Sequence, residues 1–232
     1  MFYSLRVHIL DNTIINECPF IRKALIPIMT SSDGAPFSLI KTENYLANKR
    51  LLNKEELKYL RSLGVQAFDL NSTSKNIPIL ILPRGIGRHF CAINFASAFS
   101  GSYVEIYGNS NMISEEMKLN LWLFLNSSVS WLIREISGRK NLGGGMLKAE
   151  AVDLKAFPLF YDFDDTKRIK NIYKEIQKRE ALQTLDELFT TEHKMIDDVV
   201  FNYLQIGDDF RNRIIEILSR RIIERDEKSK SS

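Results

Sequence analysis

The spacing of apolar residues changes near residue 162, and this change constrains the fold more than any other feature of the chain. Before it, short apolar runs such as Ile77–Leu82 and Tyr103–Tyr107 stand between turn signals, which predicts strands. After it, apolar residues recur with helical spacing, as at Ile196, Val199, Val200, Tyr203 and Leu204. We therefore predict an α+β fold, with a mixed sheet-and-helix domain over residues 1–161 and a helical C-terminal extension over 162–232.

Capping signals locate several helix ends within this pattern. Asn53 can cap a helix that Gly64 ends in the left-handed conformation, and Ser114 can cap a second helix. The second helix is expected to break at Asn126–Ser128 and to resume beyond it. A turn and a short strand are expected over Val152–Phe160.

Composition excludes several classes of protein. A hydrophobic content of 44% and a charged content of 26% are typical of a globular chain of this length. The two cysteines, Cys18 and Cys91, form no CxxC motif, so we expect no zinc site. So few cysteines are typical of proteins in a reducing cytoplasm, which is the expected location. The most apolar window, Leu119–Ile133, is interrupted by asparagines and serines, so no membrane span and no membrane partner are expected.

The first segment with possible binding chemistry is Arg84-Gly85-Ile86-Gly87-Arg88-His89, directly after a predicted buried strand. The third glycine of a dinucleotide-binding loop is absent, because Phe90 occupies its position. A hairpin turn would account for the glycines alone, but between Leu70 and Val104 every charged residue is basic, which suits contact with phosphates or base edges. The predicted contacts here are Lys75, Arg84, Arg88 and His89, with Gly85 and Gly87 as the loop glycines.

The second segment is Ser137–Lys148, in which three consecutive glycines permit a sharp bend or a close backbone approach. Basic residues and an asparagine flank these glycines, and such side chains bind phosphates and the edges of guanine and adenine. A flexible surface loop with incidental charges is the alternative. The predicted contacts are Arg139, Lys140, Asn141 and Lys148, around Gly143, Gly144 and Gly145.

Signals for catalysis or metal binding are weak. Asp153-Leu154-Lys155 matches half of a nuclease site, but the acidic partner that usually precedes it at a strand end is absent. The histidines, His8, His89 and His193, are scattered, and no local signature suggests a Ser-His-Asp or Cys-His arrangement. We therefore predict no catalytic residues and no metal ligands, and assign Trp122 and Trp131 to the core.

In order along the chain, three segments resemble the C-terminal target recognition domain of Taq-like adenine-N6 DNA methyltransferases, including the fused restriction–modification enzymes. These segments are Ile81–Gly87, Leu125–Ser128 and Ser137–Lys148, the last continuing into Val152–Leu159. The string Gly-Arg-Lys-Asn-Leu-Gly-Gly-Gly-Met-Leu-Lys at 138–148 is the most specific. The resemblance covers about residues 75–225 and implies a module that binds double-stranded DNA.

The chain departs from that family in its catalytic motifs. It contains no Asn-Pro step, although the family holds its target amino group with an Asn-Pro-Pro-aromatic motif. Pro83 and Arg84 stand where the acidic residue of an S-adenosylmethionine loop would be. The resemblance therefore implies a chain that is not an enzyme by itself and holds no cofactor, with S-adenosylmethionine bound by a methyltransferase catalytic domain joined to it or associated with it.

The distribution of charge is compatible with that interpretation. The net charge is only +3, but residues 183–232 carry 8 basic and 11 acidic side chains, which leaves +6 on the rest of the chain. Two other functions remain open: half of a specificity subunit of a multisubunit restriction system, or a protein-interaction module without a nucleic acid ligand.

Overall fold

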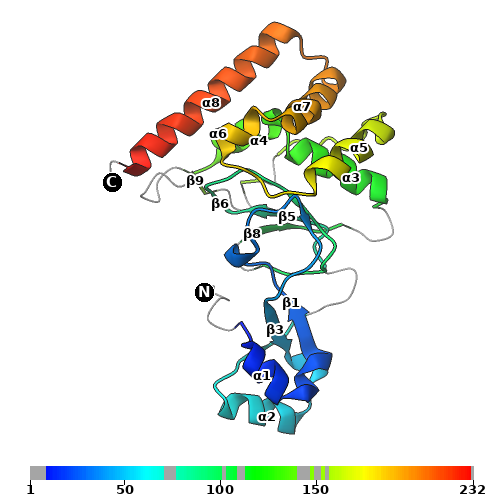
Figure 1. Ribbon diagram of the computed structural model, residues 1–232, viewed down its shortest axis with the longest axis vertical. Coiled ribbons are helices and arrows are strands. Elements are labelled where there is room, and N and C mark those ends of the chain that lie inside the picture. Colours follow the sequence, from blue (N-terminus) through cyan, green and yellow to red (C-terminus); the bar gives the residue numbers. More distant parts are fainter. Residues whose placement is uncertain are drawn as a thin grey trace.

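The computed structural model describes residues 9–70, 77–100, 103–108, 113–139, 147–148, 153–154 and 157–230, and the side chains of all of these except residue 86 and residues 228–230. Over these residues the chain has the predicted α+β fold, with short strands and helices of very different lengths. Figure 1 shows three regions along the long axis: an N-terminal lobe, a central sheet, and a layer of helices that ends in the long helix α8.

The N-terminal lobe has its own hydrophobic core, formed by residues between Leu10 and Ala67. Its sheet has the order β1-β3-β4, in which β3 is antiparallel to β1 and parallel to β4. A bridge between Ile28 and Phe99 connects the lobe to the central sheet. The elements of the lobe are α1 (Asn12–Glu17), η2 (Pro19–Ala24), β1 (Leu25–Pro27), β3 (Tyr45–Asn48), η4 (Lys49–Leu51), α2 (Lys54–Ser62) and β4 (Ala67–Phe68). The short turn η3 (Ser31–Asp33) lies beside the central sheet, between Met29 and Ala35 of the main core.

The central sheet has the order β2-β7-β5-β8, and its middle strand β5 is antiparallel to both neighbours. Every residue of β5 is buried, as its continuous apolar run predicts. In register, Leu80 lies opposite Ile93 on one side and Ile106 on the other. The strands are β2 (Ser38–Leu39), β5 (Leu80–Pro83), β7 (Ala92–Asn94) and β8 (Tyr103–Ile106).

Helices from both sides of residue 162 cover this sheet. The main core joins β5 and β7 to α3 (Glu115–Leu125), and it also contains Ile169 and Ile172 of α5 (Thr166–Ile176) and Ile196 and Val200 of α7 (Thr191–Tyr203). The change of spacing near residue 162 therefore does not separate two cores. The remaining helices of this layer are α4 (Ser128–Ser137), α6 (Thr184–Leu188) and α8 (Asp208–Lys230). Trp131 of α4 packs against residues of α6 and α8 in a smaller cluster.

The predicted helix ends are largely confirmed. Asn53 caps α2 in a capping box with Glu56, and Gly64 follows that helix at φ +76°. Ser114 caps α3, and the chain turns at Asn126 and Ser127 into α4. Local hydrogen bonding of short polar side chains thus determines these boundaries.

One local expectation is wrong. Residues 157–160 form no strand, because Pro158 lacks a ladder N–H and both Phe157 and Phe160 pack against Phe124. Helix α7 ends in a Schellman motif with Gln205 at φ +54°, in which the Ile206 N–H donates to the Phe201 carbonyl. Within the described residues, every helix is too short or too polar to span a lipid bilayer.

Two apolar residues of α7 differ in burial, so replacing each of them with alanine tests how this helix packs on the core. Ile196 is fully buried, whereas Leu204 is only partly buried against the same core. We expect Ile196→Ala to lower the free energy of unfolding by about 2–5 kcal/mol and Leu204→Ala to lower it by less than about 2 kcal/mol. Urea unfolding of both variants measures the difference, and equal losses would contradict this packing.

Candidate nucleic-acid interface

The two basic, glycine-containing segments lie side by side. Strand β6 (Gly85–Ile86) pairs antiparallel with β9 (Leu147–Lys148), so that Gly85 lies opposite Lys148. Arg139 bridges Lys148 through two backbone hydrogen bonds of 3.0 and 3.2 Å. We call this arrangement, which comprises residues 84–87, 138–139 and 147–148, the β6–β9 ribbon; Figure 1 shows its strands at the edge of the molecule near the C-terminus.

The ribbon is held on the body by close packing. Arg134 of α4 donates from Nη2 to the Pro83 carbonyl at 2.8 Å, next to the start of β6. A Cβ at Gly138 would lie 2.6 Å from the Leu147 side chain and 2.9 Å from the Arg134 carbonyl, so only glycine fits there without a shift. Leu147 is buried and packs against Leu154. The ribbon therefore presents its backbone on a fixed base.

Arg139 is the most exposed cation of the ribbon among the described residues, with 57% of its side chain accessible. Its Nη2 and Nε donate to Asp153 Oδ1 at 2.7 and 3.1 Å. The Arg139 end of this pair is open to water and salt, whereas only 16% of the Asp153 side chain is accessible. A phosphate can therefore reach the guanidinium, where it would compete with the Asp153 carboxylate. The Lys148 side chain is half-buried next to it.

Arg84 and Arg88 are both half-buried. Arg84 lies near Glu105: burial raises the pKa of Glu105, and the positive charge of Arg84 opposes that rise. Arg88 donates from Nη1 to the Ala181 carbonyl at 3.3 Å, and the Gln183 amide oxygen, in the orientation that satisfies both residues, accepts from Arg88 Nε and Nη2. Arg88 thus also fastens the segment before α6, a structural role that the sequence did not indicate.

The prediction that His89 contacts DNA is wrong, because the structure buries its side chain completely. The ring stacks on Trp131 with 5.3 Å between centroids, and its Nε2 lies 2.8 Å from Glu135 Oε1. Burial lowers the pKa of His89 to about 4, so the ring is neutral at pH 7 and donates to the Glu135 carboxylate. His89 belongs to the core beneath the ribbon.

The other predicted contacts cannot be placed. Lys75, Lys140, Asn141, Gly143, Gly144 and Gly145 lie outside the described residues. Gly87 is described: no atom lies within 4 Å of a Cβ added there, and its φ is not in the left-handed region. A turn that requires positive φ therefore does not explain this glycine, whereas an open backbone suits close approach of a ligand.

A buried polar cluster joins Ser128, His193 and Asp197. Ser128 Oγ lies 2.9 Å from His193 Nε2 and also donates to Asp197 Oδ2, while the Ser128 N–H donates to Asp197 Oδ1 at 2.7 Å. Burial raises the pKa of Asp197 and lowers that of His193. The hydroxyl proton is committed to the aspartate, and no side chain of the three is more than 7% exposed, so the cluster fixes α4 on α7 and activates no nucleophile.

The spacing of His193 and Asp197, one helical turn apart on α7, was the only sequence signal for this cluster. Ser128 lies 65 positions away, so its part in the cluster could not be inferred locally.

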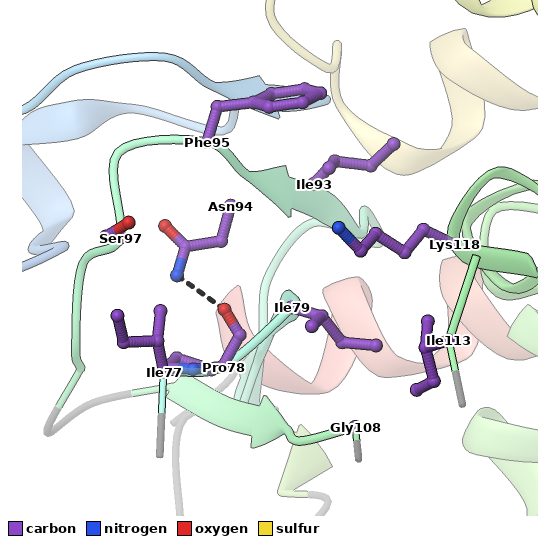
Figure 2. A pocket seen from close by; sticks show the side chains of 10 residues that line it. All are labelled: Ile77, Pro78, Ile79, Ile93, Asn94, Phe95, Ser97, Gly108, Ile113 and Lys118. Carbon is purple, nitrogen blue, oxygen red and sulfur yellow. Dashed lines mark hydrogen bonds between the residues drawn. The ribbon is translucent and has the colours of Figure 1, made fainter. Parts of the chain in front are cut away.

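Figure 2 shows a pocket of about 260 Å³ at the opposite end of β5 from the ribbon. Isoleucines line it, and two of its polar side chains already have partners: Asn94 Nδ2 donates to the Pro78 carbonyl at 2.7 Å, and Lys118 Nζ pairs with Glu115. We assign it no ligand.

Within the described residues, no group of three or more histidine, cysteine, aspartate or glutamate side chains could hold a metal ion. No protein-family model matches the chain, and no curated protein matches it either. The resemblance to methyltransferase recognition domains therefore remains a prediction from the sequence.

Proposed function

We propose that the chain is a DNA target recognition module, which binds duplex DNA and positions an adenine for a cytoplasmic adenine-N6 methyltransferase. The catalytic domain, in cis or in trans, would bind S-adenosylmethionine and receive the target base. In this proposal the chain supplies affinity and sequence preference but transfers no methyl group itself.

The observation that carries the proposal is the pairing of β6 with β9. Two segments that are far apart in the sequence, each basic and glycine-containing, meet in one ribbon. A two-stranded ribbon fits the major groove of DNA, and basic side chains along it can neutralise phosphates. Arg139 and Lys148 lie next to each other there and provide the cations.

The exposure and position of each basic residue of the ribbon indicate which part of the DNA it would contact. Lys148 is the candidate for a phosphate contact, which adds affinity for every sequence alike. Arg139 projects from the same bridge and, once released from Asp153, can contact a guanine edge or a phosphate. Arg84 stands next to β6, while the contacts expected of Lys75, Lys140 and Asn141 remain predictions from the sequence alone.

Charge variants of the ribbon test this proposal. We expect Lys148→Ala to weaken binding to all duplexes and to reduce the salt slope by about one phosphate contact, and Arg139→Ala to cost about 1–3 kcal/mol of binding free energy. Asp153→Asn removes the carboxylate that competes for Arg139, so it should tighten binding by about threefold. Fluorescence titrations with a labelled duplex at two salt concentrations measure all three effects.

Lys170→Ala is the matched control, because Lys170 is an exposed lysine on α5, on the far side of the molecule from the ribbon (Figure 1). It should leave both affinity and salt slope unchanged. If folded Lys148→Ala and Arg139→Ala proteins bind DNA as tightly as the original chain, the ribbon is not the interface. Absence of any binding at low ionic strength would favour the protein-interaction module instead.

A further inference from the structure

A second pocket, of about 220 Å³, lies between the β5–β8 strand pair and the segment that follows β9. Its walls are mostly apolar and include Leu82, Val104, Leu125 and Phe157, with the partly exposed Leu159 also among them. Leu154 lines it as well and packs against Leu147, so the pocket borders the β6–β9 ribbon from inside. Apolar walls of this kind favour the hydrophobic part of a small ligand.

Arg134 also lines this pocket, although only 1% of it is exposed to solvent. Its Nη2 donates to the Pro83 carbonyl, but Nε and Nη1 have no acceptor among the described residues. Burial lowers the pKa of Arg134 to about 10, which still leaves the guanidinium charged at pH 7. A buried cation with two unsatisfied nitrogens is costly unless an acceptor occupies the site.

The carboxylates nearby do not supply that acceptor. Glu135 already accepts from His89 Nε2 and lies 3.5 Å from Arg225 Nη2. Glu105, which lines the same pocket, accepts from the Tyr107 hydroxyl at 2.6 Å and from the Ser100 N–H. Within the described part of the chain, Arg134 therefore forms no ion pair, and the pocket combines apolar walls with the guanidinium of Arg134, two of whose nitrogens lack an acceptor, and the hydrogen-bonded carboxylate of Glu105.

We propose that this pocket binds a small molecule that has one carboxylate and a short apolar body, with the carboxylate accepting from Arg134 Nε or Nη1. The apolar body would contact Val104, Leu125 and Phe157. The volume corresponds to about seven water molecules, which is the size of a short acyl chain and excludes a nucleotide. This site is independent of DNA binding, since the ligand lies inside the body and not on the ribbon.

Three probes of one size test the charge preference: hexanoate, 1-hexanol and hexylammonium, titrated into the full chain by ligand-observed NMR. We expect hexanoate to bind about tenfold more tightly than hexanol, which corresponds to about 1.4 kcal/mol for the carboxylate, and hexylammonium to bind least. Equal binding of hexanoate and hexanol, or no saturable binding of hexanoate, would overturn the proposal without any variant.

Variants then locate the site. Arg134→Met should abolish the tenfold preference for hexanoate over hexanol, and Val104→Phe should fill the pocket and remove binding of both. Ile113→Phe makes a comparable change in the pocket of Figure 2 and should leave hexanoate binding intact. Hexanoate binding that survives Val104→Phe in a folded protein, or that is lost in Ile113→Phe, would show that the ligand binds elsewhere.

Discussion

Asn126→Leu is expected to lower the free energy of unfolding by about 3–5 kcal/mol, because it leaves two buried backbone groups without partners. Asn126 is fully buried at the junction of α3 and α4. Its Oδ1 accepts from the Cys91 N–H at 2.8 Å, and its Nδ2 donates to the Cys91 carbonyl at 3.1 Å and to the Trp122 carbonyl at 2.9 Å. The Asn126 side chain thus satisfies the backbone groups of Cys91, directly before β7, and links them to Trp122 of α3.

Asn53→Leu is the matched comparison, since Asn53 is exposed and caps only α2. Loss of that cap should cost about 1 kcal/mol. Urea unfolding of the two variants gives both values from the midpoints, provided that the denaturant slopes agree. An Asn126→Leu protein at least as stable as Asn53→Leu would contradict the role assigned to the buried amide.

Stability is expected to fall as the pH drops from 6.5 to 4, because His89 is held neutral in the core. Its folded-state pKa of about 4 lies below the ordinary value of 6.5, so the stabilisation is complete above pH 6.5 and is lost as the pH falls through about 4. This difference in the pKa of His89 between the folded and unfolded states corresponds to a loss of about 3 kcal/mol in the free energy of unfolding once the pH lies below both values.

The groups around His89 explain why its pKa is lowered. Desolvation makes the largest contribution, the positive charges of Arg134 and Arg225 add to it, and Glu135 opposes it. Burial also lowers the pKa of His193, which adds in the same direction, whereas the raised pKa of Asp197 acts in the opposite sense near the lower end of the window.

His89→Gln removes the titrating ring and retains an N–H that can donate to Glu135. Thermal unfolding of this variant between pH 7 and pH 4 should show a shallower decline than the unchanged chain. Identical pH profiles for the two proteins would mean that His89 does not account for the acid sensitivity.

The parts of the fold that depend on neighbouring residues could be predicted from the sequence. Caps such as Asn53 and Ser114 act over three positions, and the all-apolar run around Leu80–Leu82 can only be a buried element. Trp122 and Trp131 lie in the core for the same reason, since each stands on a mostly apolar helix.

What the sequence could not reveal depends on partners distant along the chain. The sequence predicted that His89 contacts DNA because it stands among arginines, but its hydrogen-bond partner Glu135 lies 46 positions away. Arg88 likewise meets Ala181, 93 positions away. The spacing of apolar residues predicted the helices α5 and α7 but not that both complete the core of the central sheet. The two basic segments of the ribbon are separate in the sequence, and only the three-dimensional structure shows that they pair.

Hydrogen–deuterium exchange of the full chain, with and without a mixed-sequence duplex at low ionic strength, tests the central claim most directly. Binding through the β6–β9 ribbon predicts slower exchange at the described amides of residues 84–88, 138–139 and 147–148, no change in α2 and α5, and loss of this protection as salt is added. Unchanged exchange throughout the chain, or protection confined to α2, α5 or α8, would contradict it.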